Sequence, residues 1–524
     1  MSNGRDVARP PAGNIVLTSR WEPEDEAFWN ETGKRRAFRN LWLSIPCLLC
    51  AFSVWMYWSI IIVQMDNLKF PFSKDQLYTL TAIAGLLGAT LRIPNSFFIA
   101  LCGGRNTIAV TTSLLILPAL GAGIALQDKT TPYSVFALLA GLSGIGGGAF
   151  ASSMSNISFF FPKRMQGLAL GLNAGFGNIG VSLMQVMLPY VMTFGLFGAL
   201  GGDGLTAGLA PTDKLVWIQN CGLVWVPILL TLTVLAWLIM ENLPIHRIAS
   251  TSGAITNLLW ISFLGLVSGG MGGYLLIGAK WNMWVVLPVT VVLTLLLMRY
   301  LTPAQVRGKL SDQFVIFGKK HNWVMTWLYT MTFGSFIGYS AAFPKLIQDV
   351  FGYLPDGSVN PVAPNPLSYA WLGPLVGSII RPIGGWLSDK WGGARVTQWT
   401  TVAMIASALG AAYYIKLAGH APNPETYFMP FLLLFLLLFV TTGVGNGSTF
   451  RMIPMIFEAR LAGPILGWTS AVAAYGAFII PKVFGGQIQN KTPEYALYGF
   501  SIYYMTCLIV NWWFYARKNA EIPC

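Results

Sequence analysis

Two arginines of this sequence stand inside long apolar runs, where a charged side chain has no water to solvate it. Arg92 lies in LRIPNSF and Arg381 in IIRPIGG, and neither run contains an acidic residue. An arginine at the centre of a bilayer costs roughly 2.5–3.5 kcal/mol on insertion scales, so such charges usually serve a function. The guanidinium group stays charged and donates hydrogen bonds in a planar fork. We therefore expect the two side chains to bind a small anion with several oxygen atoms.

Several aromatic and polar residues of the apolar runs could complete this anion site. The candidates are Phe150, Tyr329, Phe333, Asn173, Asn178, Asn446 and Ser470. The aromatic rings could form flat walls for a planar, weakly hydrated anion, and the polar side chains could donate hydrogen bonds. The alternatives are ordinary packing for the rings and helix–helix hydrogen bonds for the polar groups. The arginines could instead bond backbone carbonyls or extend to the membrane surface.

The composition indicates which elements must position these residues. Hydrophobic residues make up 54% of the 524-residue chain and charged residues 10%, and the mean hydropathy is +0.58. Soluble domains carry about 25% charged residues, which excludes a cytosolic enzyme, a disordered chain and a secreted disulfide scaffold. The six cysteines are scattered, and Cys47 and Cys50 lie in an apolar run, as expected of packing residues. The composition predicts an all-α polytopic membrane protein.

Apolar runs long enough to cross a bilayer recur along the whole chain, and we count fourteen. They fall at about 41–65, 77–102, 107–126, 134–160, 168–193, 217–240, 257–279, 281–301, 323–347, 367–388, 396–417, 428–453, 462–486 and 497–516. The first run is too long for a signal peptide, so we expect no cleavable leader. The three histidines lie outside the middle of these runs, so a histidine proton relay has no candidate.

The basic residues predict the orientation of the helices. When the chain crosses the membrane at each run, most of the 33 lysines and arginines fall on the side of the termini. Cytoplasmic loops carry an excess of these residues. We therefore expect both termini in the cytoplasm, and we attribute the net charge of +13 to membrane topology rather than to nucleic-acid binding.

The two halves of the chain resemble each other. Each arginine sits in the second run of its half, and GIGGGAF at 144–150 corresponds to GVGNGSTF at 443–450. Two repeated halves with a site between them are the usual architecture of secondary transporters. The glycines predict close helix packing, with sliding surfaces as a further interpretation. GFGNIG at 175–180 matches a dinucleotide motif, but no strand precedes it, so we expect no nucleotide site.

The predicted fold is therefore two pseudo-symmetric six-helix bundles with a helix pair inserted between them. The inserted pair could pack on a bundle or on a partner, or act as a simple spacer. The expected domains are a cytoplasmic segment 1–40, a first bundle 41–245, the inserted pair 246–305, a second bundle 306–518 and a cytoplasmic tail 519–524.

Particular stretches resemble a known family of transporters. GGWLSDKWGGAR at Gly384–Arg395 resembles the loop motif of the major facilitator superfamily, including Gly385, Asp389 and Arg395. GLNAGFGNIGVSLMQ and WTSAVAAYGAFIIPKVFG resemble the two signatures of its nitrate/nitrite porter branch. FASSMSNISFFFPK and YTMTFGSFIGYSAAF match that branch as well, so the resemblance covers nearly the whole chain.

The resemblance implies a major facilitator fold that alternates access by rocking its two bundles. It implies that Arg92 and Arg381 bind nitrate or nitrite, with Phe150, Tyr329, Phe333 and Asn173 around the anion. The signature residues expected along the moving helices are Gly171, Gly175, Asn178, Gly467, Ser470 and Gly476. The expected partners are the two anions and the lipid bilayer of a bacterial inner membrane. We expect no cofactor, metal ion or nucleic acid, and a monomer is compatible with the sequence.

The sequence departs from this family in two places. The usual twelve helices become fourteen through the inserted pair, and Arg451 stands where a neutral residue is expected. We expect Arg451 at the cytoplasmic mouth, and it could alter anion affinity if it reached the pathway.

Three functions remain open at this level. Nitrate/nitrite antiport is favoured, because two fixed charges repel in an empty site and no carboxylate within a run is available to carry a proton. Proton-coupled nitrate symport is the alternative, in which Tyr329 or a protonated water could serve. A membrane nitrate sensor or an integral-membrane enzyme is a remote third, because the loops contain no kinase, metal-site or nucleophile pattern.

Overall fold

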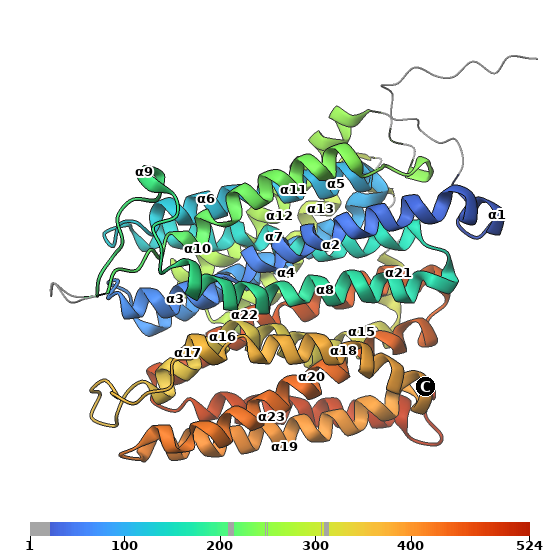
Figure 1. The fold of residues 1–524 in the computed structure, drawn as a ribbon. Coiled ribbons are helices and arrows are strands. Elements are labelled where there is room, and N and C mark those ends of the chain that lie inside the picture. The colour runs from blue at the N-terminus through green and yellow to red at the C-terminus, as the bar shows by residue number, and fades with distance from the viewer. Residues whose placement is uncertain (1–20, 208–213, 247, 249, 305–306, 309–313) are drawn as a thin grey trace, which may run out of the picture.

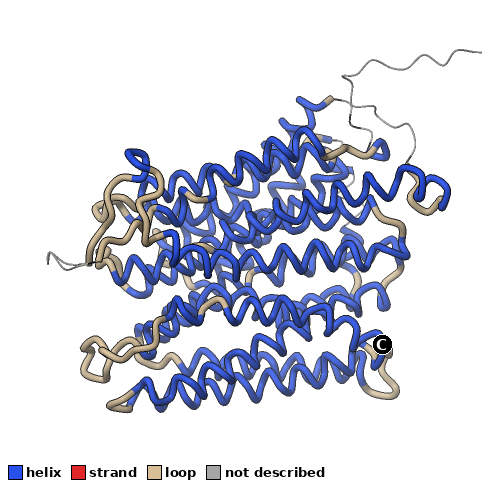
Figure 2. The backbone as a smooth tube through the Cα atoms, viewed as in Figure 1, coloured by secondary structure: helices blue, strands red, loops and turns tan. Residues whose placement is uncertain are grey.

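We describe a computed structural model of the chain, which covers residues 21–207, 214–246, 248, 250–304, 307–308 and 314–524. Within these residues the chain is almost entirely helical (Figure 2), with two isolated β-bridges, Leu205 to Val216 and Tyr353 to Val359. The long helices run side by side. In Figure 1 the first half, blue to green, forms the upper layer, and most of the second half, orange to red, forms the lower one.

The first half begins with two short helical segments and continues through long helices. Its elements are α1 (Glu26–Phe28), η1 (Trp29–Gly33), α2 (Lys34–Met56), α3 (Trp58–Asn67), α4 (Lys74–Cys102), α5 (Gly104–Leu114), α6 (Ile116–Ala125), α7 (Tyr133–Phe160), α8 (Lys163–Val191), α9 (Gly198–Gly201), α10 (Asn220–Leu223), α11 (Trp225–Ile239) and η2 (Pro244–His246).

A helix pair and the second half follow. Their elements are α12 (Thr251–Ile277), α13 (Met283–Leu301), η3 (Phe314–Gly318), α15 (Lys320–Tyr329), η4 (Thr330–Gly334), α16 (Ser335–Phe351), α17 (Pro366–Tyr369), α18 (Leu372–Trp391), α19 (Gly393–His420), η5 (Pro424–Tyr427), α20 (Phe428–Ile456), α21 (Ala459–Ala474), α22 (Gly476–Gln489), α23 (Glu494–Asn511) and η6 (Trp512–Ala516).

Among the described residues, 11 helical stretches are long and apolar enough to cross a membrane, which agrees with an integral membrane protein. The other three predicted runs fall on α15 to α16, on α18 and on α23, so the number of fourteen crossings stays a prediction. Residue 21 and the C-terminus lie at the same end of the bundle (Figure 1). We call this the terminal end, and we call the other one the opposite end.

Both halves break the chain in the same way between their second and third long helices. Gly103 ends α4 with φ of 81°, and Gly392 ends α18 with φ of 90°. A residue with a side chain is strained in this region of φ, so glycine allows the next helix to start at once. The repeat seen in the sequence therefore reappears as a matching turn in the structure.

The glycines shared by the two repeats lie where helices cross closely. A Cβ on Gly144 of α7 would lie 2.6 Å from the backbone nitrogen of Gly88 on α4. In the second half, a Cβ on Gly443 of α20 would lie 2.4 Å from the backbone oxygen of Gly377 on α18. Neither crossing leaves room for a side chain. The close crossings hold the two arginine-bearing helices, α4 and α18, against their neighbours.

The inserted helix pair packs on the first half. On α12, a Cβ on Gly265 would lie 2.8 Å from the side chain of Leu91 on α4, and a Cβ on Gly269 would lie 2.8 Å from that of Leu87. Within the pair, Thr294 of α13 donates a hydrogen bond to the hydroxyl of Ser268 on α12. The pair thus sits directly against the outer face of the helix that carries Arg92 (Figure 1).

Candidate functional site

The structure places the two arginines inside the protein, on matching helices of the two halves. The Arg92 side chain is fully buried on α4, and Arg381 is 8% exposed on α18. Arg92 donates from Nε to the carbonyl oxygen of Gly147 at 3.0 Å and from Nη1 to that of Ser470 at 3.2 Å. Because Ser470 belongs to α21, Arg92 links the first half of the chain to the second.

Three aromatic rings form a stack between the arginines. The rings of Phe150 and Phe333 have centroids 6.2 Å apart at 24°, and those of Tyr329 and Phe333 are 5.6 Å apart at 9°. The guanidinium carbon of Arg92 lies 4.8 Å from the Phe150 centroid and 5.1 Å from that of Phe333. At the other end of the stack, Nη2 of Arg381 donates to the Tyr329 hydroxyl at 3.3 Å. The stack therefore connects the two arginines across the halves.

Each guanidinium keeps a buried donor without an acceptor. Nη2 of Arg92 and Nη1 of Arg381 have no hydrogen-bond partner within the part of the chain that the structure describes. A buried donor left unsatisfied costs about 1–3 kcal/mol, and more when it is charged. The Ser378 hydroxyl, one turn before Arg381 on α18, is likewise buried without a partner. A small oxyanion would supply the acceptors that these groups lack.

A rare helix type carries Phe333 to the stack. Residues Thr330–Gly334 form the π-helix η4 between α15 and α16, and π-helical turns often occur at functional sites. A Cβ on Gly476 would lie 2.1 Å from the carbonyl oxygen of Gly334, so η4 presses on the start of α22. No sequence pattern predicts this π-helix, although Gly334 and Gly476 are recognisable as small residues that allow close packing.

The predicted signature residues divide into tight and open positions. Gly476 makes the close contact with η4, and Gly467 faces the side chain of Ser96 on α4. Gly171 and Gly175 of α8 instead have no heavy atom within 4 Å of an added Cβ. The terminal half of α8 is therefore less closely packed at these two glycines than α21 and α22 are at theirs.

Neither of the two predicted asparagines, Asn173 and Asn178, has a recorded hydrogen bond with Arg92 or Arg381. Asn173 is buried and donates to the Ser153 hydroxyl at 2.8 Å, which ties α8 to α7. Asn178, one and a half turns further along α8, is buried with neither side-chain atom paired among the described residues. Ser470 contributes its carbonyl oxygen to Arg92, while its own hydroxyl bonds the carbonyl oxygen of Gly467. The predicted site thus comes together around the arginines and the three rings.

The loop motif lies at the terminal end, away from the stack. Asp389 is more than half exposed and pairs with Arg451, while Arg395 is exposed and Gly385 has open space beside it. Arg451 is therefore engaged at the terminal end of α20, and its place at the cytoplasmic mouth stays a prediction. Its guanidinium has an acidic partner, unlike those of Arg92 and Arg381.

Sequence reasoning missed a set of ion pairs that join the halves at the opposite end. Lys345 of α16 is fully buried and contacts Asp66 of α3 at 2.8 Å and Asp349 at 2.6 Å, and Lys74 of α4 reaches Asp349 at 3.0 Å. A second pair joins Lys482 of α22 to Asp75 at 2.8 Å. These residues lie at the ends of predicted runs, and opposite charges at the same end of the bundle were the available signal.

Polar contacts near the ion pairs add to this closure. The Gln348 side-chain amide donates to the Asn67 side-chain oxygen at 2.7 Å, and Gln185 of α8 donates to the carbonyl oxygen of Ser340 at 3.1 Å. We call the ion pairs and these two hydrogen bonds the opposite-end closure. The hydroxyls of Thr90 and Tyr475, 2.9 Å apart, join the halves deeper in the bundle, because Thr90 lies two residues before Arg92 on α4.

Known proteins similar to this chain are membrane transporters. The model of the Major Facilitator Superfamily matches residues 43–481. The chain is 39% identical to the "Probable nitrate/nitrite antiporter NarK2" of Thermus thermophilus, over 96% of this chain and 97% of that one. It is 36% identical to the "Nitrate/nitrite transporter NarU" of Salmonella typhimurium, over 97% and 98% of the two chains.

Solved structures show the same fold at low sequence identity. The xylose transporter XylE from E. coli, in a partially occluded inward open conformation, matches with a TM-score of 0.59 and 12% identity, over 91% of this chain and 99% of that chain. Tetrameric PepTSo2 matches with a TM-score of 0.56, over 91% and 96% of the chains. The repeated halves, the membrane-spanning helices and these matches agree: the chain is a transporter rather than an enzyme, and it belongs to the nitrate/nitrite branch of the Major Facilitator Superfamily.

Proposed function

We propose that this protein exchanges nitrate for nitrite across the membrane by alternating access around Arg92 and Arg381. The observation that carries the proposal is the pair of buried guanidinium groups beside one aromatic stack, each with one donor nitrogen that lacks an acceptor among the described residues. The relatives named as nitrate/nitrite transporters support the choice of anion. Nitrate and nitrite are small and planar, as the stacked rings require.

The bound anion accepts hydrogen bonds from Nη2 of Arg92 and Nη1 of Arg381, while the rings of Phe150, Phe333 and Tyr329 exclude water. Because the arginines belong to different halves, an anion between them draws the halves together. In the empty site the two positive charges repel across a medium of low dielectric constant. Return of the empty carrier is therefore unfavourable, and one anion leaves only when another replaces it.

The ion pairs and hydrogen bonds of the opposite-end closure must break before the anion can pass to the other side of the membrane. In the state described here the closure joins the halves at one end, while Gly171 and Gly175 have open space near the terminal end. We place the termini in the cytoplasm on the distribution of basic residues. The described state then gives the anion access from the cytoplasm.

Proton-coupled nitrate symport is a second candidate, and a specific observation favours it. The Asp349 side chain is fully buried between the halves, and its Oδ2 atom has no hydrogen-bond partner among the described residues. When the opposite end opens, Asp349 and Asp66 separate from Lys345. In a symport cycle, Asp349 is the buried carboxylate to which we assign the proton.

Counterflow in liposomes distinguishes the two functions. Purified protein is reconstituted with nitrite inside, and uptake of labelled nitrate is followed without a pH gradient. Antiport predicts uptake that requires internal nitrite and is unchanged by a proton ionophore. Nitrate accumulation driven by a pH gradient into liposomes without internal anion would falsify antiport and support symport.

A further inference from the structure

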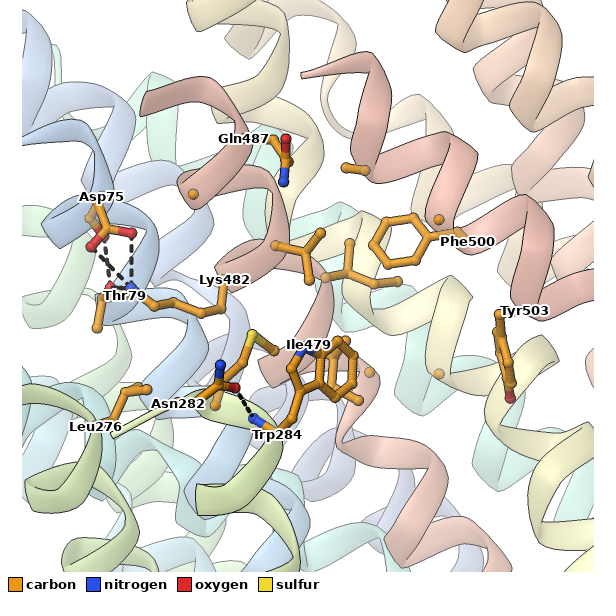
Figure 3. Close-up of a pocket in the computed structure, with 18 of the residues that line it drawn as sticks. Asp75, Thr79, Leu276, Asn282, Trp284, Ile479, Lys482, Gln487, Phe500 and Tyr503 are labelled. Carbon is orange, nitrogen blue, oxygen red and sulfur yellow. Dashed lines mark hydrogen bonds and ion pairs between the residues drawn. The ribbon is translucent and has the colours of Figure 1, made fainter. Parts of the chain in front are cut away.

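A large groove opens beside the inserted helix pair, and the transport cycle proposed above assigns no occupant to it. Its volume is about 1070 Å³. The turn between α12 and α13 forms one wall, the first turn of α4 another, and η4, α22 and α23 the rest (Figure 3). We call it the lateral groove. It is the place where the first half, the second half and the inserted pair meet.

The lateral groove is apolar along its length and polar at one end. Ile479, Val483, Phe500 and Tyr503 line its length, while Asn282, Gln487 and the Asp75–Lys482 ion pair lie toward the opposite end of the bundle (Figure 3). Along α23 the lining extends from Tyr495 to Tyr503, which is about 12 Å of helix. That length is close to half of the roughly 30 Å hydrocarbon core of a bilayer. The groove therefore matches one leaflet in depth.

Glycines leave the floor of the groove open. Gly486 on α22 and Gly499 on α23 both line it, and an added Cβ at either position would have no heavy atom within 4 Å. Glycine in a helix costs about 1 kcal/mol relative to alanine. Here the two glycines make space that no side chain of the described residues fills, and in a membrane an apolar space of this size takes up a hydrocarbon chain.

The rim of the groove carries an excess positive charge. Asp75 and Lys482 neutralise each other, whereas Lys280 is exposed at the α12–α13 turn and forms no ion pair among the described residues. Trp281 and Trp284 stand beside it, 47% and 59% exposed. Tryptophan side chains concentrate at the membrane–water interface. The rim thus combines an interfacial aromatic pair with an unpaired ammonium group, which together suit an anionic phosphate.

We propose that the lateral groove is a binding site for one anionic phospholipid, with an acyl chain along α22 and α23 and the phosphate beside Lys280. The occupant is a lipid because the groove is lined by helices long and apolar enough to cross a membrane, among them α4, α12, α13 and α22. The groove also matches one leaflet in depth and has its charge only at the rim. The inserted pair thereby gains a role, because its turn supplies both the basic residue and one wall of the site.

Native mass spectrometry of the delipidated, full-length protein tests this site. The protein is titrated in detergent with dioleoylphosphatidylglycerol and, for comparison, with dioleoylphosphatidylcholine. We expect one tightly bound phosphatidylglycerol per chain. Gly499→Leu and Gly486→Leu fill the floor on two different helices, and each should weaken this binding at least tenfold. Lys280→Gln should lower the affinity for phosphatidylglycerol to that for phosphatidylcholine.

Gly270→Leu is the matched control, because Gly270 of α12 also has open space beside it but does not line the groove. It should bind phosphatidylglycerol like the wild type. The proposal is overturned if Gly499→Leu and Gly486→Leu, with wild-type unfolding temperatures, bind the lipid as Gly270→Leu does. It is also overturned if Lys280→Gln keeps the full preference for phosphatidylglycerol, or if Gly499→Leu breaks up a dimer of the chain instead of displacing a lipid.

Discussion

At the scale of single residues, the site depends on how each arginine is held. Arg92 donates from Nε and Nη1 to the backbone carbonyl oxygens of Gly147 and Ser470, and this fixes the direction of its third nitrogen, Nη2. Arg381 is held by the Tyr329 hydroxyl alone among its recorded hydrogen bonds. A lysine at either position keeps the charge but loses the planar fork and these hydrogen bonds.

Arg92→Lys and Arg381→Lys should therefore lose transport while keeping the charge of the site. A hydrogen bond to a charged group contributes about 1.5–3 kcal/mol, which corresponds to a roughly ten- to hundredfold loss. Labelled nitrate uptake in counterflow measures the effect. Arg451→Lys is the control, because Arg451 pairs with Asp389 at the terminal end, and it should transport at nearly the wild-type rate. Equal losses in all three variants would contradict the assignment of the site.

Tyr329→Phe isolates the hydroxyl that holds Arg381. The phenylalanine ring can keep the stack with Phe333, while the hydrogen bond at 3.3 Å is lost. The donor is the charged Arg381 guanidinium, and a hydrogen bond to a charged group contributes about 1.5–3 kcal/mol. We therefore expect KM for nitrate to rise roughly tenfold or more. Phe333→Leu, which removes a ring and keeps the hydroxyl, should act by a different route and lower the selectivity for planar anions. A Tyr329→Phe variant with unchanged KM would show that Arg381 does not need this contact.

At the scale of elements, the glycine crossings decide which helices stay together. α4 meets α7 at Gly144, and α18 meets α20 at Gly443, with backbone in direct contact at both crossings. By contrast, the long helical paths of α2 with α3 and of α21 with α22 are interrupted at Tyr57 and Tyr475, and η4 interrupts α15 with α16. Close backbone contacts also reach the interrupted helices, since a Cβ on Gly146 of α7 would lie 2.1 Å from the carbonyl oxygen of Ala51 on α2.

Gly144→Ala should destabilise the protein, although alanine is the better helix former. Its Cβ would lie 2.6 Å from the Gly88 backbone nitrogen, and overpacking of this kind costs about 1–3 kcal/mol. Gly167→Ala on α8 is the control, because it has open space and should gain up to about 1 kcal/mol. Thermal unfolding of the purified variants measures both effects. A Gly144→Ala variant as stable as Gly167→Ala would mean that α4 and α7 can move apart to accept an added methyl group at little cost in stability.

At the scale of the whole molecule, the opposite-end closure sets which end is accessible. Lys345 forms ion pairs with Asp66 from the first half and Asp349 from the second. The side chains of Lys345 and Asp349 are fully buried, and that of Asp66 is 18% exposed. Removing one partner from a buried ion pair costs about 3–5 kcal/mol, because the other charge stays buried. That cost applies only while the end is closed, so the loss of Lys345 shifts the population toward opening.

Lys345→Met should widen the opposite end. Spin labels at Lys69 and Ser358, which are exposed and belong to different halves, report the distance between the halves by double electron–electron resonance. We expect a new, longer distance in Lys345→Met. Lys320→Met is the matched control, since Lys320 pairs with Glu521 inside the second half, and it should leave the distance distribution unchanged. An identical distribution in both variants would show that other contacts keep the end closed.

The sequence was sufficient for the fold class and for proposing the members of the anion site, and insufficient for the geometry of that site. Arg92 and Arg381 stand out because a lone charge in an apolar run is costly, and the repeat assigns them to matching helices. Phe150 and Phe333 stack although they lie far apart in the sequence and in different halves of the chain. A local sequence pattern therefore cannot predict this contact. Asp66, Asp75, Lys345 and Lys482 looked like ordinary helix-end charges, because pairing between halves is a tertiary property.

The glycine crossings have a consequence for how force passes through the protein. Backbone in contact with backbone transmits a push without side chains that can change rotamer and absorb it. Each half is therefore stiff around its arginine, and bending is expected where the helical path of α2 and α3 is interrupted at Tyr57. Amide hydrogens near Gly144 and Gly443 should exchange with solvent slowly, and within the long helices those at Tyr57 should exchange sooner.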